Sequence, residues 1–166
     1  MQLVLLSLGS SIGDRKKNID NALYLLELVG VKQQRQSSYY ETEPVGGVAN
    51  NKFLNTAFLA QTNFTPKELL FICKSIEFAL GRRVAKTWAD REIDIDILLY
   101  EDEIIETSFL KIPHPFFHNR RFALEPAVEI APNMVHPKFK KKLEYLLQEC
   151  QDKNEVKKLL NINTIK

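Results

Sequence analysis

The stretch Ile93-Asp94-Ile95-Asp96-Ile97 alternates branched apolar side chains with carboxylates. Successive side chains of a β-strand point to opposite faces of the sheet, so the alternation predicts a strand over 92–100 whose isoleucines face a core. Asp94 and Asp96 then share the other face, about 7 Å apart by the rise of a strand. Two carboxylates in this arrangement suit Mg²⁺, which prefers hard oxygen ligands. The same pattern also fits a half-buried strand with a solvated acidic face.

The segment before this strand is basic. Its cations lie within ten residues and are Arg82, Arg83, Lys86 and Arg91. A solvated turn would have the same composition, but cations beside metal-binding carboxylates are what a polyphosphate site needs. Trp88 lies in the same segment and either caps the core or packs over a bound substrate. The chain has no GxxxxGK[ST] and no GxGxxG motif, so any nucleotide is held without a P-loop or a dinucleotide-binding loop.

Outward from this strand, strand and helix patterns mix without strict βαβ alternation, which favours an α+β fold with an antiparallel or mixed sheet. The predicted strands cover 2–8, 31–41, 53–62 and 92–100, with a hairpin return at 102–106. The predicted helices cover 15–29, 66–80, 125–131 and 140–150, the first capped by Asp14 and the second by a Thr65–Glu68 capping box. We expect the polar end, 151–166, to form a short helix and a frayed terminus.

Asn55 lies in an otherwise apolar run, so its amide must find hydrogen-bond partners when it is buried. The amide offers a donor and an acceptor side by side, which suits the edge of a guanine-like ring. Phe53 shares its face of the strand and could stack on such a ring. Pairing of Asn55 with neighbouring backbone is the alternative.

His114 lies between Pro113 and Pro115, which hold it in an extended segment. It is either a phosphate donor or a hydrogen-bonded turn residue. Arg120 and Arg121 add positive charge shortly afterwards.

The bulk properties exclude several classes of protein. The 166 residues are 45% hydrophobic and 27% charged, as in globular domains, and the net charge of +2 gives no strong attraction to nucleic acid or anionic membranes. Cys73 and Cys150 form no CxxC pair, which favours free thiols in a reducing cytosol. No apolar run approaches the roughly 20 residues of a membrane helix. We therefore expect one cytoplasmic domain over 1–166, its end at 151–166 unassigned.

Together these motifs resemble the 6-hydroxymethyl-7,8-dihydropterin pyrophosphokinases of folate biosynthesis, over nearly the whole chain. The resemblance implies a ferredoxin-like, three-layer α+β sandwich around a mainly antiparallel sheet. It also implies transfer of diphosphate from ATP to the pterin hydroxymethyl group, with release of AMP and two Mg²⁺ ions as cofactors, and we expect a monomer. The residues that carry it are 8–12 (Leu-Gly-Ser-Ser-Ile), 40–46 (Tyr-Glu-Thr-Glu-Pro-Val-Gly), 53–57 (Phe-Leu-Asn-Thr-Ala), 113–115 (Pro-His-Pro), and Arg82, Trp88, Arg91, Asp94 and Asp96.

The resemblance also implies roles for individual residues. Metal ligands would be Asp94 and Asp96. Phosphate contacts and catalytic residues would be Arg82, Arg91, His114 and Arg120, with Trp88 on the mobile catalytic loop. The pterin would lie between Phe53 and Phe122, with its edge bound by Asn55 and by backbone near Thr42, Glu43 and Val45. The nucleotide side would involve Leu69, Leu70, Glu77 and Ile97.

The chain departs from this family at Ala89-Asp90, where members commonly have Gly-Pro, and its loop is one residue shorter. Asp90 places a negative charge beside Arg91, which opposes a phosphate clamp. One alternative is therefore an inactive pterin- or nucleotide-binding paralogue. The other is a ferredoxin-like RNA-binding module, for which 15–17 and 138–142 supply basic stretches but no aromatic RNP-type strand exists.

Overall fold

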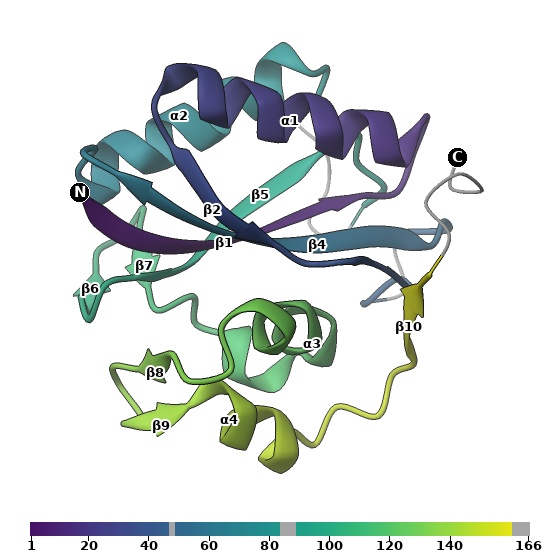
Figure 1. The fold of residues 1–166 in the computed structure, drawn as a ribbon. Helices are drawn as coiled ribbons and strands as arrows, with labels where there is room; N and C mark the ends of the chain where they lie inside the picture. Colours follow the sequence, from purple (N-terminus) through teal and green to yellow (C-terminus); the bar gives the residue numbers. More distant parts are fainter. Residues whose placement is uncertain (47–48, 84–88, 161–166) are drawn as a thin grey trace.

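A computed structural model of the chain describes residues 1–46, 49–83 and 89–160. A six-stranded antiparallel sheet forms its middle layer (Figure 1). Helices α1 (Arg15–Val29) and α2 (Pro66–Ala79) cover one face, while α3 (Arg121–Ile130), with α4 (Leu143–Glu149) packed on it, covers the other. The predicted three-layer α+β sandwich is confirmed. No helix in the described ranges is long and apolar enough to cross a membrane.

The sheet runs in the order β10-β3-β4-β1-β5, and β2 joins it on the same edge of β4 as β3. Its strands are β1 (Gln2–Ser10), β2 (Lys32–Gln36), β3 (Tyr39–Thr42), β4 (Phe53–Thr62), β5 (Asp94–Tyr100) and β10 (Val156–Leu159). Two small hairpins pair β6 (Ile105–Glu106) with β7 (Lys111–Ile112) and β8 (Val135–His136) with β9 (Lys141–Lys142). A short 3₁₀ helix spans Phe117–Asn119.

Local signals set the first two helices as predicted. The Asp14 carboxylate accepts from the Lys17 N–H at 3.0 Å, and Gly30 ends α1 with φ of 109°, a conformation that glycine adopts at low cost. The Thr65 hydroxyl and the Glu68 carboxylate form the predicted capping box of α2. Both helices begin at the predicted residues, because the side chains that cap them lie within a few residues of each helix start.

The predicted strand over 31–41 was wrong as one element, since it is divided into β2 and β3. Ser37 causes the break, because its side chain takes over hydrogen bonds that a regular ladder would make. Its hydroxyl accepts from the Ala57 N–H at 2.9 Å and donates to the Ser38 carbonyl at 2.8 Å.

Three later predictions also differ from the structure. The predicted hairpin return to 92–100 does not form, because β6 pairs with β7 instead. The helices begin at Arg121 and Leu143 rather than at 125 and 140. Within the terminal segment, Val156–Leu159 form β10 rather than a helix, because they meet the open edge of β3, where Val156 pairs with Thr42. The predicted frayed end, 161–166, lies outside the described residues. Pairing with a distant strand overrides a weak local preference.

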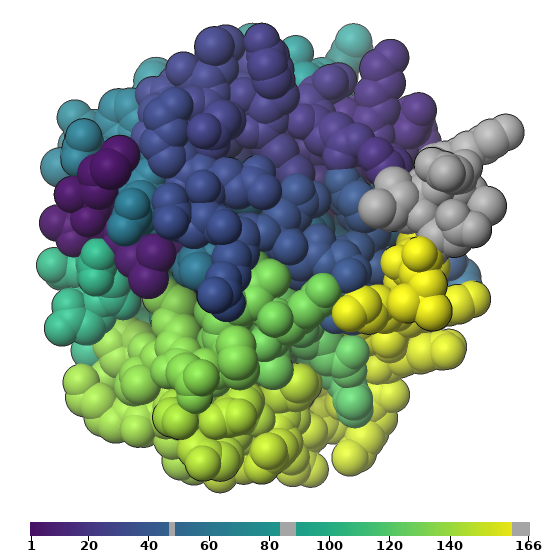
Figure 2. Space-filling view, viewed as in Figure 1, coloured from purple at the N-terminus to yellow at the C-terminus, as the bar shows by residue number. Residues whose placement is uncertain are grey.

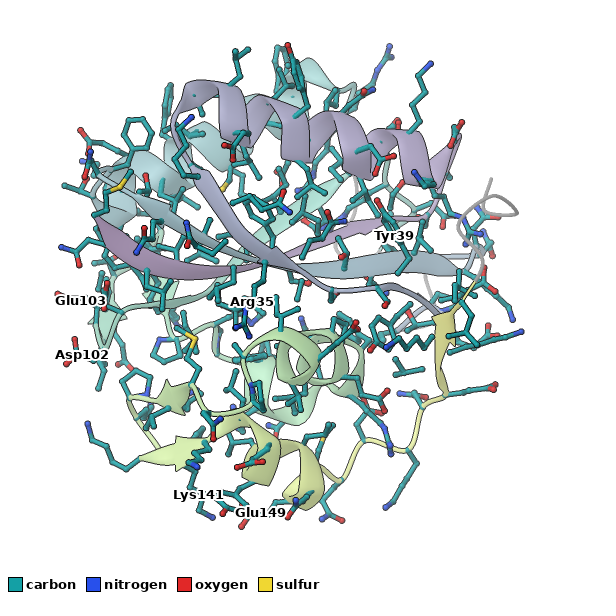
Figure 3. The ribbon with its side chains drawn as sticks, in the orientation of Figure 1. Arg35, Tyr39, Asp102, Glu103, Lys141 and Glu149 are labelled. Atoms are coloured by element: carbon teal, nitrogen blue, oxygen red, sulfur yellow. The ribbon has the colours of Figure 1, made fainter. Side chains whose placement is uncertain are left out.

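Most of the C-terminal part of the chain (green to yellow in Figure 2) lies beneath the N-terminal part, while β10 near its end joins the sheet beside β3. Arg35, labelled in Figure 3, reaches from β2 to the Ile130 carbonyl at the end of α3, at 3.1 Å. This bond satisfies a carbonyl that the helix leaves unpaired. Lys141 and Glu149, also labelled, form an ion pair that ties β9 to α4. The first contact fixes α3 against the sheet, and the second holds β9 and α4 together.

Candidate active site

Three neighbouring strands change from apolar to polar side chains on the face of the sheet that α3 covers. Ala57 on β4, Leu5 on β1 and Leu98 on β5 belong to the core on that face. The next residues on the same face form a polar floor, and they are Asn55 and Phe53 on β4, Ser7 and Gly9 on β1, and Asp96 and Asp94 on β5.

The pairing register brings this floor together. Gly9 is opposite Asn55 on one side and opposite Asp94 on the other. Because adjacent strands lie about 4.8 Å apart, Asn55 and Asp94 are about 10 Å apart across Gly9. A cavity of about 230 Å³ lies over the floor. Its lining comprises Ser7, Gly9, Thr42, Glu43, Val45, Phe53, Asn55, Lys74, Arg82, Ala89, Arg91, Asp94, Asp96, Arg120 and Phe122.

One end of the cavity carries a buried amide, that of Asn55. Asn55 is only 4% exposed, and its Nδ2 donates to the Thr42 hydroxyl at 2.9 Å. This bond fixes the orientation of the amide. A Cβ at Gly9 would lie 2.8 Å from Asn55 Oδ1, so only glycine leaves room for the amide there. Phe53 and Phe122 line the same cavity.

The other end carries the acidic pair. The isoleucines of β5 are buried, as predicted, and both carboxylates face the cavity. Asp94 accepts from Arg82 Nη1 at 2.7 Å and from Arg91 Nη1 at 3.0 Å. Burial, together with the charge of Asp94, raises the pKa of Asp96 to about 7. The pair therefore concentrates negative charge that the neighbouring arginines only partly offset.

Glu77 lies behind the acidic pair and does not line the cavity. It is 2% exposed, accepts the Ile95 N–H at 2.7 Å, and forms ion pairs with Arg82 at 2.5 Å and Lys74 at 3.0 Å. Burial raises the pKa of Glu77, and the Lys74 charge and the Ile95 N–H oppose that shift. The geometry makes Glu77 an anchor for Arg82.

A second hollow adjoins the first at the outer edge of β5. Lys74 and Asp96 line both hollows, and Leu70, Ile97 and His114 line the second, on the predicted nucleotide side. The prediction for Leu69 needs correction. Its side chain is fully buried in the core between the sheet and helices α1 and α2, because it lies on the inner face of α2.

The surroundings of His114 set its tautomer and its protonation state. The Phe116 N–H donates to His114 Nδ1 at 3.2 Å, which leaves the ring proton on Nε2. Burial, with a contribution from the Arg120 charge, lowers the pKa of His114 to about 4. At neutral pH His114 is therefore an uncharged donor through Nε2.

Arg120 lies at the start of α3, on the wall of the first cavity. Its guanidinium carbon is 4.8 Å from the centre of the Phe116 ring and 5.8 Å from that of Phe122, distances at which cation–π attraction operates. Burial lowers its pKa, against the pull of Asp96 and Asp94. Two aromatic rings thus hold a cation beside the acidic pair.

Sequence reasoning missed four residues of the floor and wall, Ser7, Gly9, Lys74 and Ala89. Lys74 could have been predicted from the sequence, because it lies three residues before Glu77 and four after Leu70 on one helix face.

Trp88 lies outside the described residues. No cluster of three or more His, Cys, Asp or Glu side chains that could hold a metal occurs in the described ranges, so the acidic pair offers two carboxylates.

The expected conflict between Asp90 and Arg91 is absent. The Asp90 carboxylate turns away from the cavity and accepts the backbone N–H groups of Asn50 and Asn51, each at 3.2 Å. Arg91 is therefore free of that charge and pairs with Asp94.

Comparison with known proteins agrees with this geometry. A family model described as 7,8-dihydro-6-hydroxymethylpterin-pyrophosphokinase matches residues 5–132. The chain is 43% identical over 144 residues to the 2-amino-4-hydroxy-6-hydroxymethyldihydropteridine pyrophosphokinase of Aquifex aeolicus, covering 87% of this chain and 89% of that protein. It is 39% identical over 137 residues to a folic acid synthesis protein of Schizosaccharomyces pombe, covering 82% of this chain and 19% of that one.

Among solved structures, Plasmodium falciparum HPPK-DHPS with pteroate matches with a TM-score of 0.73 at 18% identity. The match covers 89% of this chain and 42% of that one, and it supports the fold alone. The family model and the relatives at about 40% identity show more: the chain belongs to the 7,8-dihydro-6-hydroxymethylpterin-pyrophosphokinase family.

Proposed function

We propose that the described cavity is where this pyrophosphokinase transfers diphosphate from ATP to the hydroxymethyl group of 6-hydroxymethyl-7,8-dihydropterin, releasing AMP, in folate biosynthesis. One observation carries the proposal. A single cavity joins an oriented, buried amide with aromatic neighbours to an acidic pair flanked by arginines, on a common floor at Gly9. A flat heterocycle and a polyphosphate need these two environments side by side.

The amide end fits a pterin. Asn55 Nδ2 is engaged by Thr42, and Oδ1 faces the space above Gly9, where it would accept from a ring N–H. Phe53 and Phe122 would contact the ring faces, and Thr42, Glu43 and Val45 supply the surrounding wall. A buried polar site of this kind discriminates strongly against ligands that leave its groups unpaired.

The acidic end fits Mg²⁺, and Asp94 and Asp96 would hold it. Two carboxylates without His or Cys ligands match a cation that takes one or two carboxylates and completes its shell with phosphate oxygens and water. Held by Asp94 and Asp96, the ion would supply positive charge that offsets the negative charge of the phosphates. That two ions bind remains a prediction from the family resemblance.

The chain's own groups would then align the reactants. Arg82 and Arg91 would turn from Asp94 to the phosphates, Arg120 would approach from α3, and His114 would donate through Nε2. The substrate hydroxyl oxygen bonds to the β-phosphorus and its proton passes to solvent. The bond from the β-phosphorus to the α,β-bridging oxygen breaks, and AMP leaves with that oxygen. Positioning and charge neutralisation supply most of the catalysis.

Resolving the nucleotides after mixing the protein with ATP, Mg²⁺ and 6-hydroxymethyl-7,8-dihydropterin tests this proposal. We expect AMP to appear in step with pterin diphosphate. Formation of ADP would instead identify an ordinary kinase. Binding of the pterin without any product would identify an inactive paralogue.

Stabilisation by Mg²⁺ should depend on pH. The folded pKa of Asp96, about 7, exceeds the value of about 3.9 for an unfolded aspartate. The folded chain therefore binds more protons than the unfolded chain between these values, and without a divalent cation its stability falls as pH rises through that range. Mg²⁺ binds the ionised form, so it should raise the unfolding temperature more at about pH 8 than at about pH 6.

Calorimetric scans at both pH values, with and without Mg²⁺, measure this difference. Asp96→Asn is the control, because its side chain does not titrate. An equal Mg²⁺ effect at both pH values in the unaltered protein would contradict the assignment of Asp96.

Gly9→Ala should weaken pterin binding more than it weakens the fold. The new Cβ would lie 2.8 Å from Asn55 Oδ1, so the amide must move from the orientation that Thr42 fixes. We expect the dissociation constant of 6-hydroxymethylpterin, measured by fluorescence titration, to rise about tenfold or more, the cost of one misplaced buried hydrogen bond. The double variant Gly9→Ala/Asn55→Ala is the control. It should bind no worse than Asn55→Ala alone, and an additive loss would show that Gly9 acts elsewhere.

We also propose that the chain acts as one domain over 1–166, as a monomer, in the cytoplasm, with no nucleic-acid or membrane partner. Cys73 and Cys150 are free thiols, which fits a reducing compartment. The small net charge of +2 supports the absence of polyanionic partners.

A further inference from the structure

We infer that Asp90 is a positioning residue that joins the segment of the phosphate-binding Arg91 to the wall of the pterin end of the cavity, so that pterin affinity depends on it. The inference rests on the proposed function. It concerns a residue that does not itself line the cavity.

The carboxylate of Asp90 is engaged on both oxygens. Oδ2 accepts the Asn50 N–H and Oδ1 accepts the Asn51 N–H, each at 3.2 Å. Partial desolvation raises the pKa of Asp90, but the two backbone N–H groups, with the nearby side chains of Ser11 and Asn51, outweigh it and hold the pKa below its ordinary value. The ionised form of Asp90 is therefore the one that makes this contact.

The backbone of the next residue makes a second connection at the same place. The Arg91 N–H donates to Ser11 Oγ at 2.9 Å, and the Arg91 carbonyl accepts the N–H groups of Ser11 at 2.9 Å and Ile12 at 3.4 Å. Residues 90–91 thereby bind two separate segments, the turn after β1 and the residues that lead into β4. The Arg91 side chain continues from this junction to Asp94.

The residues held by Asp90 lead directly to the pterin end. Asn51 is two residues before Phe53, the first residue of β4, and Asn55 follows on the same face. The neighbouring Lys52 carbonyl accepts from Arg15 Nη1 at 2.9 Å, and the Lys52 side chain pairs with Glu43 on the cavity wall at 2.8 Å. Asp90 thus ties the entry of β4, and with it Phe53, to the segment that presents Arg91.

Removing the carboxylate should free residues 50 and 51 while leaving the floor intact, because Asn55 and Asp94 are held by the ladders of β1. Two backbone donors bonded to the two oxygens of one carboxylate constrain residues 50 and 51 together. We expect Asp90→Ala to raise the dissociation constant for the pterin about tenfold, and Asp90→Asn to raise it less, since one acceptor oxygen remains.

The test compares the full-length protein with Asp90→Ala, Asp90→Asn and Glu68→Ala. Glu68 is the matched control, because its carboxylate also accepts a backbone N–H, that of Thr65 at 2.8 Å, but at the far end of α2. The dissociation constant of 6-hydroxymethylpterin is measured with Mg²⁺ and a non-hydrolysable ATP analogue present, and that of the analogue is measured separately. Hydrogen exchange of the Asn50 and Asn51 amides reports the contact itself.

The inference is supported if Asp90→Ala weakens pterin binding about tenfold, leaves analogue binding within about twofold, and speeds exchange at Asn50 and Asn51, while Glu68→Ala does none of these. Unchanged pterin binding would overturn it. Equal weakening for both ligands would also overturn it, since that outcome indicates a general loss of structure. AMP formation by the unaltered protein tests the proposed function separately, so the two failures are distinguishable.

Discussion

Replacement of Asp94 or Asp96 by alanine should lower the turnover number by about a thousandfold or more, while pterin affinity changes by less than about threefold. Both carboxylates face the phosphate end of the cavity, and Asp94, the nearer of the two, is about 10 Å from Asn55 by the strand spacing. Removing either leaves at most one carboxylate for Mg²⁺. Several kcal/mol of charge neutralisation at the phosphates would then be lost, and each 1.4 kcal/mol costs about tenfold in rate.

Asp96→Asn separates this effect from damage to the fold. The variant keeps the side-chain shape and removes the charge that Asp94 opposes, so its unfolding temperature without Mg²⁺ should not fall at neutral pH. Asp102→Ala is the control, because Asp102 is an exposed aspartate just beyond the other end of β5 (Figure 3). Steady-state rates and thermal scans on these four variants suffice. Near-normal turnover in Asp94→Ala or Asp96→Ala would refute the metal assignment.

Signals carried within a few residues were readable from the sequence. The alternation of Ile93 to Ile97 placed both carboxylates on one face because the period of a strand is local. The caps at Asp14 and Thr65 fixed two helix starts for the same reason. The amide of Asn55 was expected to need a partner, and the structure supplies Thr42.

Features that depend on distant pairing were not readable. The register that sets Gly9 between Asn55 and Asp94 joins three strands far apart in the chain. Leu69 falls on the apolar stripe that helical spacing predicts for this helix and is buried, but only the packing around α2 decides that Leu70 lines a hollow. The charge of Asp90 suggested conflict with Arg91, because sequence proximity does not show which way a side chain turns.

Glu77→Ala should have the largest effect on stability. The variant leaves the Ile95 N–H without its buried acceptor and deprives Arg82 and Lys74 of their shared partner. Breaking a buried ion pair commonly costs 3–5 kcal/mol, but Arg82 is partly exposed and keeps Asp94, so we expect a loss of about 2–4 kcal/mol in the free energy of unfolding. Urea denaturation measures this loss.

The same variant should lower the turnover number by about tenfold to a hundredfold, because Arg82 loses the anchor that aims it at the phosphate end. Glu77→Gln tests that explanation. Its amide oxygen still accepts the Ile95 N–H, but the neutral side chain no longer forms an ion pair with Arg82. It should recover much of the stability and little of the rate. Glu68→Ala, at the other end of α2, should cost only about 0.5–2 kcal/mol and leave the rate unchanged. If Glu77→Gln restored full activity, the ion pair with Arg82 would have no part in catalysis, and Glu77 would serve only to bind the backbone of β5.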